Sequence, residues 1–288
     1  MSTFIEFLTA VLFGIVEGIT EWLPVSSTGH IILMKELCPP DMSLSVYNFF
    51  EIIIQLAAIL AVVVMFFRKL NPFALSKTPE QKKSTWQLWF KVVVAVLPSA
   101  VLGLWIDEKM DNYLENVQIM GTTLKVVVVA AALIVYGVIF ILLERNSKKQ
   151  FRIQEVGQID YKTALLIGLF QCLSIIPGTS RSGATILGAI LLGVSRPAGA
   201  EFSFFLAIPT MLGAGLLKLL KFLKEGVVLQ SNQIMFIAVS CAVAFIVSLI
   251  AIKGLMEYVR KHSFSVFGVY RIALGVLVIG YFAVSNYA

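Results

Sequence analysis

The stretch GIVEGITEWLPVSSTGHIIL, residues 14–33, decides the fold of this 288-residue chain. It is apolar at both ends, but its middle holds Pro24 and a run of hydroxyl side chains, which interrupt a continuous membrane helix. A second stretch, GLFQCLSIIPGTSRSGATIL at 168–187, aligns with it at a constant offset of 154 residues, so that Ser26 falls on Ser180. Each stretch therefore predicts a pair of half-helices joined by a polar turn.

The composition of the chain is that of an integral membrane protein. Hydrophobic residues make up 58% of it and charged residues only 14%, against about half and about a quarter in soluble domains. Six further apolar blocks are long enough to cross roughly 30 Å of hydrocarbon as helices. We predict an all-α polytopic membrane protein with six spanning helices plus two re-entrant helical hairpins, an inverted-topology repeat. The six blocks are 46–68, 86–106, 120–143, 200–220, 233–258 and 267–286.

The order of hairpins and spans predicts this inverted repeat. Each hairpin is followed by three spans, and because three is odd, the second copy enters the membrane from the opposite side. We expect one domain over 1–288, with repeats at 1–145 and 160–288. The alternative is that both hairpins are merely kinked spans. The basic connections at 68–91 and 144–162 are assigned to the cytoplasm, which places both termini outside.

The first hairpin carries two acids followed by three hydroxyls. Glu17 and Glu21 are four residues apart and share a helix face. Carboxylates placed together in an apolar sequence are expected to share a proton, pair with a cation or hold a divalent metal. Ser26, Ser27 and Thr28 are expected to cap the second half-helix, whose free N–H groups and positive dipole end attract anions. The first tip is therefore a candidate anion and cation site.

His30 lies within one helical turn of these hydroxyls. It is one of two histidines in the chain, and the other, His262, lies in a basic turn where we expect it to be solvated. An imidazole beside hydroxyls and carboxylates suits proton transfer. A structural histidine with satisfied hydrogen bonds is the alternative interpretation.

The second hairpin carries an arginine in the segment PGTSRSGAT, residues 177–185. A guanidinium at membrane depth costs at least ~2.5 kcal/mol, and its planar fork matches phosphate or carboxylate oxygens. Thr179 and Ser180 are expected to cap the following half-helix, and Gly183 to let the backbone approach a ligand. We therefore predict that Arg181 binds phosphate. An ion pair with a glutamate that only holds the two repeats together is the alternative.

The two motifs, EGITEWLPVSSTGH at 17–30 and PGTSRSGAT at 177–185, resemble those of the bacterial undecaprenyl-diphosphate phosphatases, also called bacitracin-resistance proteins. The resemblance extends over essentially the whole chain. It implies hydrolysis of undecaprenyl diphosphate to undecaprenyl phosphate and inorganic phosphate, with a divalent cation such as Mg²⁺ or Ca²⁺. It also implies a multi-pass protein of the bacterial plasma membrane whose active site faces outward.

The resemblance and the residue chemistry together assign roles to the candidate residues. We expect Ser27 to attack the terminal phosphorus, His30 to manage the proton and Arg181 to clamp the oxygens. Glu17 and Glu21, on which the family's Glu-x-x-x-Glu element falls, are expected to hold the metal or tune His30, and Glu21 is counted among the catalytic residues. Attack by water, or by His30 itself, stays open. The further phosphate-binding candidates are Ser26, Thr28, Thr179, Ser180, Ser182 and Gly183.

Two other functional classes fit parts of the sequence. A prenyl-phosphate transporter or flippase, alone or combined with the phosphatase, fits because inverted repeats with broken helices are typical of secondary transporters. A scaffold for envelope complexes is the third class. The expected partners are undecaprenyl diphosphate and membrane lipid but no nucleic acid, since a net charge of +6 fits membrane orientation and anionic lipid. A homodimer is left open.

Overall fold

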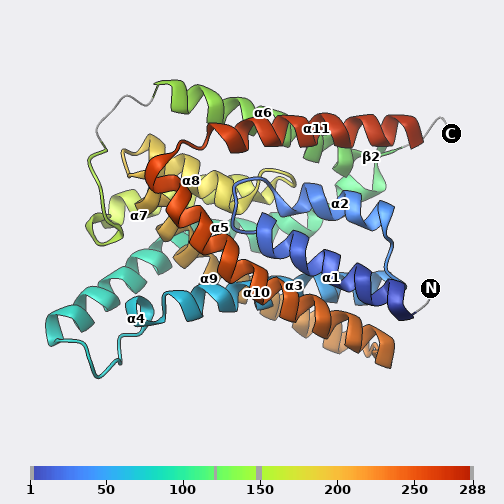
Figure 1. The fold of residues 1–288 in the computed structure, drawn as a ribbon, viewed down its shortest axis with the longest axis horizontal. Helices are drawn as coiled ribbons and strands as arrows, with labels where there is room; N and C mark the ends of the chain where they lie inside the picture. Colours follow the sequence, from blue (N-terminus) through green and yellow to red (C-terminus); the bar gives the residue numbers. More distant parts are fainter. Residues whose placement is uncertain (1–2, 120–121, 147–150, 286–288) are drawn as a thin grey trace.

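The computed structural model describes residues 3–119, 122–146 and 151–285, and this part of the chain is predominantly helical (Figure 1). Within it, six helices are long and apolar enough to cross a membrane, and each overlaps one of the six predicted blocks. The prediction of an all-α polytopic membrane protein is therefore confirmed. The six helices are α3 (Leu44–Met65), α5 (Pro79–Asn116), α6 (Leu124–Asn146), α9 (Arg196–Glu225), α10 (Ser231–Lys261) and α11 (Ser265–Ser285).

The two interrupted stretches form helical hairpins. The first consists of α1 (Thr3–Thr20) and α2 (Ser27–Leu37), and the second of α7 (Tyr161–Gln171), the 3-10 turn η2 (Cys172–Ile175) and α8 (Arg181–Leu191). The first hairpin begins and ends at the end of the molecule where α11 ends, and the second at the opposite end (Figure 1). Their placement in a bilayer, and the repeat boundaries at 1–145 and 160–288, stay predictions.

The short elements lie at the two ends of the helical bundle. The helix α4 (Phe67–Leu70) and the 3-10 turn η1 (Val156–Gln158) lie at the end where α6 finishes, together with the turn between α10 and α11 (Figure 1). The paired two-residue strands β1 (Gln118–Ile119) and β2 (Thr122–Thr123) lie at the other end. The predicted cytoplasmic segments thus share one end. The terminal residues 1–2 and 286–288 lie outside the described residues, so their external placement stays a prediction.

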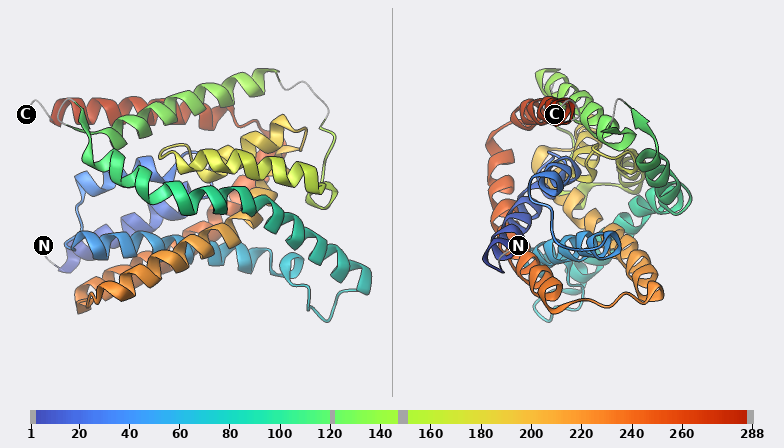
Figure 2. Two further views of the ribbon diagram at one scale, coloured as in Figure 1. Left: turned by 180° about the vertical axis from the view of Figure 1, so that it is seen from behind. Right: turned by 90° about the vertical axis from the view of Figure 1, so that its right-hand side faces the viewer.

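Each hairpin packs against a span of the other half of the chain. Helix α1 packs on α10 and α7 packs on α5, and small residues allow both contacts. A Cβ added to Gly14 would lie 2.7 Å from the carbonyl oxygen of Ser240, and one added to Gly168 only 2.0 Å from that of Ala95. These two glycines are aligned by the offset of 154 residues. Each half of the chain therefore packs its hairpin against a span of the other half. Helices α6 and α11 also come from different halves and lie along each other on one side (Figure 2).

Helix α5 is longer than the predicted block 86–106 because its ends are fixed by polar contacts. At its start, Thr78 and Gln81 form a reciprocal capping box, which fixes the helix N-terminus outside the apolar block. Near its end, Lys125 of α6 binds Glu115 at 2.8 Å. The sequence pattern located the apolar part of this helix, whereas the cap and the ion pair determine its full length.

Candidate active site

The tips of the two hairpins share an unusual backbone conformation. Ser26 has a φ of 73° and Ser180 a φ of 69°, and in the described part of the chain they are the two non-glycine residues with positive φ. Such a conformation costs on the order of 1–3 kcal/mol and persists only where the surroundings hold it in place. Each serine immediately precedes a helix, α2 or α8. The two strained residues occupy positions that the offset of 154 residues aligns, which fits the predicted repeat.

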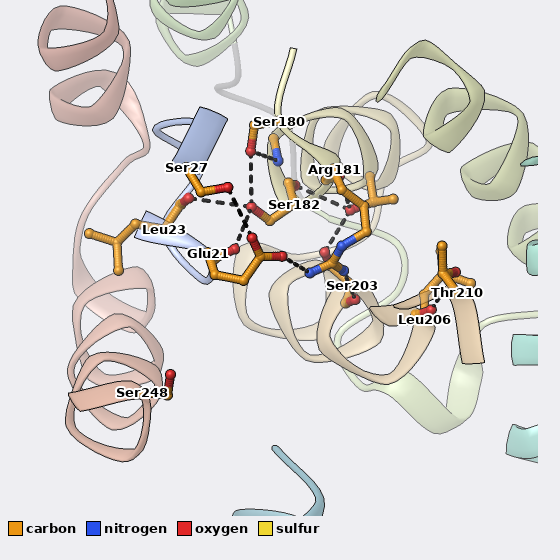
Figure 3. A network of polar contacts seen from close by, with 12 residues as sticks. Glu21, Leu23, Ser27, Ser180, Arg181, Ser182, Ser203, Leu206, Thr210 and Ser248 are labelled. Atoms are coloured by element: carbon orange, nitrogen blue, oxygen red, sulfur yellow. Dashed lines mark hydrogen bonds and ion pairs between the residues drawn. The ribbon is translucent and has the colours of Figure 1, made fainter. Parts of the chain in front are cut away.

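An ion pair joins the second tip to the first. Arg181 Nη2 donates to Glu21 Oε1 at 3.0 Å, and Nη1 donates to the carbonyl oxygen of Ser203 at 3.0 Å (Figure 3). The side chains of Arg181 and Glu21 are only 10% and 9% exposed. The guanidinium also lies 6.0 Å from the centre of the Trp22 ring. The structure therefore brings together the arginine and one of the two carboxylates on which the predicted site depends.

Glu21 also accepts a hydrogen bond from the serine of its own tip. Ser27 Oγ donates to Glu21 Oε2 at 3.0 Å, so both carboxylate oxygens are engaged, one by a cation and one by a hydroxyl (Figure 3). Ser182 closes the site from the other side, because its Oγ lies 3.2 Å from the carbonyl oxygen of Glu21 and 3.1 Å from Ser180 Oγ. Ser27 thus has a carboxylate in place to receive its proton.

Glu17 lies beside this line of contacts. The Glu21 amide donates to the Glu17 carbonyl at 3.1 Å, so the helical spacing continues past the end of α1 and the predicted common face is kept. Glu17 is 1% exposed, and its Oε1 has no hydrogen-bond partner in the described part of the chain. A buried carboxylate oxygen without a donor is suited to a proton or a cation.

The donor set is incomplete for a metal held by protein alone. The described residues contain no group of three or more His, Cys, Asp or Glu side chains placed to hold a metal ion. Mg²⁺ often binds through one or two carboxylates together with substrate phosphates. The free oxygen of Glu17 fits that arrangement, whereas Glu21 already binds Arg181 and Ser27. The cation stays a prediction, and Glu17 is the carboxylate with an oxygen left for it.

His30 does not use either ring nitrogen to contact Ser27. Its Nδ1 lies 2.7 Å from the carbonyl oxygen of Ser26 and its Nε2 lies 2.7 Å from Tyr270 Oη. The hydroxyl of Ser27 is bonded to Glu21 instead. The hydrogen-bond partner of the serine hydroxyl is therefore a carboxylate, and the role of His30 in proton transfer stays a prediction.

Helix capping differs between the two tips. Ser180 caps α8 as predicted, because its Oγ accepts a hydrogen bond from the Gly183 amide at 3.1 Å. The prediction for Ser26 is wrong: it occupies the capping position of α2 without a capping hydrogen bond, and its Oγ is buried without a partner among the described residues. The N-terminus of α2, which includes Thr28, is therefore left without a side-chain cap.

Arg271 is a site residue that the sequence analysis missed. It lies on α11, is fully buried, and donates to the carbonyl oxygens of both tips. Its Nη1 is 3.2 Å from Pro24, and its Nη2 is 2.9 Å from both Gly178 and Thr179. A Cβ on Gly183 would lie 3.1 Å from Nη1, so this glycine leaves room for the guanidinium. Arg271 thus holds the two tips together.

A sequence signal for Arg271 was available. It interrupts the last apolar block, in the run FGVYRIALG, and an ionisable residue inside a membrane span is by default a functional candidate. The repeat alignment compares only the two hairpins, so it gives no information on this span. A count of charges within predicted spans would have identified the residue.

Comparison with known proteins covers nearly the whole chain. Residues 10–277 match the family model of the bacitracin resistance protein BacA. Undecaprenyl-diphosphatase 1 of Clostridioides difficile is 52% identical over 284 residues, which covers 98% of this chain and 99% of the relative. The undecaprenyl-diphosphatase of Enterococcus faecalis is 52% identical, covering 96% and 97%. That of Lactobacillus delbrueckii subsp. bulgaricus is 50% identical, covering 95% and 97%.

Proposed function

The chain belongs to the bacitracin resistance protein BacA family, and from this premise we infer that it hydrolyses undecaprenyl diphosphate to undecaprenyl phosphate and inorganic phosphate. The observation that assigns this function to particular residues is a pair of contacts at Glu21. One carboxylate oxygen binds Arg181, and the other accepts a hydrogen bond from Ser27. These contacts place a cation, a proton acceptor and a hydroxyl nucleophile next to one another. These are the groups that transfer of a phosphoryl group requires.

The surroundings of these contacts favour a diphosphate. The N-terminus of α2 lacks a side-chain cap, so its amide groups and its dipole are available to phosphate oxygens. Arg181 Nε has no partner in the described part of the chain, and Arg271 adds a second buried positive charge. Phosphate oxygens that bind Arg181 replace part of its contact with Glu21. The carboxylate is then released to act as a base.

The reaction proceeds in two displacements. In the first, Ser27 Oγ forms a bond to the terminal phosphorus, its proton passes to Glu21 Oε2, and the bond from phosphorus to the bridging oxygen breaks, releasing undecaprenyl phosphate. In the second, water attacks the phosphoserine and the Ser27 Oγ–phosphorus bond breaks. Glu21 returns its proton to Ser27, and His30 takes the proton of the water. Arg181 stabilises the charge on the transferred oxygens in both displacements.

The site is part of a multi-pass membrane protein, and the prenyl chain of the substrate stays in lipid against the apolar surfaces of the spans. We place it in the bacterial plasma membrane with the site facing outward, because the basic connections lie at the end opposite the first hairpin's entry. Glu17 is the residue that would hold a divalent cation. Such an ion, when bound, supplies positive charge to the diphosphate oxygens.

The decisive experiment is acid-quenched trapping with substrate labelled in its terminal phosphate. Purified protein in detergent with Mg²⁺ or Ca²⁺ is expected to release phosphate and to carry label on Ser27. Ser27→Ala is expected to abolish both. Ser240→Ala is the matched control, because Ser240 is a buried serine whose hydroxyl bonds to the Ala10 carbonyl, outside the site. Label on His30, or release without any trapped label, would contradict the serine mechanism.

A further inference from the structure

His30 is held on both sides of its ring. Its Nδ1 lies 2.7 Å from the Ser26 carbonyl oxygen and its Nε2 lies 2.7 Å from Tyr270 Oη. The rings of His30 and Tyr270 also lie nearly parallel, with centroids 5.6 Å apart and an interplanar angle of 11°. Tyr270 comes from α11, the helix that also supplies Arg271, and thus from a part of the chain 240 residues away.

These contacts determine the tautomer of His30. A carbonyl oxygen only accepts hydrogen bonds, so Nδ1 must carry the proton that reaches Ser26. In a neutral imidazole Nε2 is then the acceptor, and the Tyr270 hydroxyl is the group that donates to it. The strained backbone of Ser26, with its φ of 73°, directs the carbonyl that fixes this arrangement. The basic nitrogen of His30 is therefore Nε2, and its direction is set by Tyr270.

We propose that Tyr270 is a positioning residue of the active site, which acts through His30 by holding Nε2 as the basic nitrogen that receives the proton of the attacking water. This inference rests on the function proposed above. In the second displacement the oxygen of water bonds to phosphorus, the Ser27 Oγ–phosphorus bond breaks, and the water proton passes to Nε2. Because Nε2 has a single lone pair, the Tyr270 hydroxyl proton rotates away from it as the water proton arrives, and Tyr270 Oη then accepts a hydrogen bond from the protonated Nε2.

The chain provides a matched control pair. Tyr258 and His262 are also stacked, with centroids 4.6 Å apart and an interplanar angle of 17°. However, His262 Nδ1 contacts the backbone carbonyl of Tyr258, at 3.2 Å, and this pair lies at the turn between α10 and α11. Tyr258→Phe therefore removes a tyrosine hydroxyl beside a histidine without altering the contact that holds the ring.

The first test is nitrogen NMR of the imidazoles, which does not depend on activity. With two histidines in the chain, His262→Asn assigns both sets of signals. We expect His30 to show a protonated Nδ1 and an unprotonated, hydrogen-bonded Nε2. Tyr270→Phe is expected to move the Nε2 signal toward that of a free nitrogen, while Tyr258→Phe leaves it unchanged. A protonated Nε2 at neutral pH, or no change in Tyr270→Phe, would overturn the proposal.

The second test separates positioning from a general structural effect. Tyr270→Phe keeps the stacked ring and is expected to lower kcat about tenfold with KM nearly unchanged, as is usual for groups that orient a functional histidine. In a His30→Gln background the same substitution is expected to have no further effect. Equal losses in both backgrounds would indicate a structural role and would overturn the proposal, and so would wild-type kcat in Tyr270→Phe.

The measurements distinguish failure of the proposed function from failure of the role of Tyr270. If the wild-type protein releases no phosphate from undecaprenyl diphosphate, the proposed function fails, while the NMR signals still report whether Tyr270 holds His30. If the wild-type protein is active and Tyr270→Phe matches it in both measurements, the proposed function stands and only the role of Tyr270 is rejected.

Discussion

The tips of the two hairpins have the same backbone but different chemistry. Ser26 and Ser180 have nearly equal positive φ values and precede α2 and α8. Around them, the aligned positions differ: Ser27 corresponds to Arg181, and His30 to Ala184. In the mechanism proposed above, the first tip supplies the nucleophile and the proton-transfer groups, and the second supplies Arg181. On that proposal a diphosphate site requires both tips.

This difference shows how two aligned hairpins can carry different polar groups. At the start of α8, the Ser180 hydroxyl accepts a hydrogen bond from a backbone amide. At the start of α2 no side chain does so, which leaves the backbone amides for a ligand. Gln171 stands where the first hairpin has Glu17, and it is occupied by neutral partners, Ser99 Oγ at 2.5 Å and Thr210 Oγ1 at 3.2 Å. Gln171 of the second hairpin thus makes neutral contacts with α5 and α9, whereas Glu17 of the first keeps a carboxylate oxygen without a partner among the described residues.

The largest expected effect follows from removing Arg181, the cation of the second tip that pairs with Glu21 of the first. Arg181→Ala is expected to lower phosphate release at least about 10³-fold, because it removes transition-state stabilisation. It also leaves Glu21 buried without its partner, at a cost of about 3–5 kcal/mol. Phosphate release and thermal unfolding in detergent micelles measure the two effects. Arg181→Lys, which keeps the charge but loses the planar fork, is expected to recover much of the stability but little of the activity.

Arg260→Ala is the control for this prediction, since Arg260 lies exposed at the end of α10. It is expected to resemble the wild-type protein in both measurements. If Arg181→Ala kept near wild-type activity, the proposed contribution of the second tip to the reaction would be wrong, and this tip would contribute only structure.

Glu17→Gln makes the first hairpin resemble the second at the aligned position. The amide keeps the size of the side chain but removes the charge that suits a cation. We expect the concentration of Mg²⁺ or Ca²⁺ for half-maximal activity to rise about tenfold, by analogy with other altered metal ligands. Titration of the cation at saturating substrate measures this effect. An unchanged titration would show that Glu17 does not hold the ion.

Much of the fold could be predicted from the sequence, because membrane spans are encoded by the length of apolar blocks. The hairpins were identified by Pro, Gly and hydroxyl residues in otherwise apolar stretches, such as Pro24 and Gly178. The full length of α5 was not predicted, because it depends on a cap and on an ion pair with α6. Local pattern thus located the elements, and contacts outside the apolar blocks determined where they end.

The candidate site could be predicted only as far as the repeat reached. The pattern of the two tips identified Glu21 by its spacing from Glu17, Ser27 within a run of hydroxyls and Arg181 as a charge in an apolar stretch, and the structure brings these three together. The pattern did not identify Arg271 or Tyr270, because α11 has no motif and their contacts with the tips arise from tertiary packing. It also did not show that Ser27 bonds to Glu21, since such pairing depends on the course of the turn between them.

A smaller effect is expected from adding a methyl group at the aligned glycines. A Cβ on Gly183 would lie 3.1 Å from Arg271 Nη1, whereas one on Gly29 would meet the Leu133 Cδ1 methyl at 3.0 Å. A leucine side chain adjusts with little cost, but the guanidinium is fixed by three carbonyl oxygens. We therefore expect Gly183→Ala to lower activity several-fold more than Gly29→Ala. Parallel rate measurements on the two variants check this, and a larger loss in Gly29→Ala would contradict the role of Arg271.

The smallest effect concerns the serines that give the tips their common shape. Ser180→Ala removes the hydroxyl that accepts from the Gly183 amide, and loss of such a cap typically costs about 1 kcal/mol. Ser26→Ala removes a hydroxyl that caps nothing, so no capping energy is lost and the free energy of unfolding is expected to change less. Denaturant unfolding in mixed micelles compares the two variants directly. Equal destabilisation would mean that the strained backbone, and not the capping hydrogen bond, determines the stability of both tips. The cap at Ser180 would then not distinguish the second tip from the first.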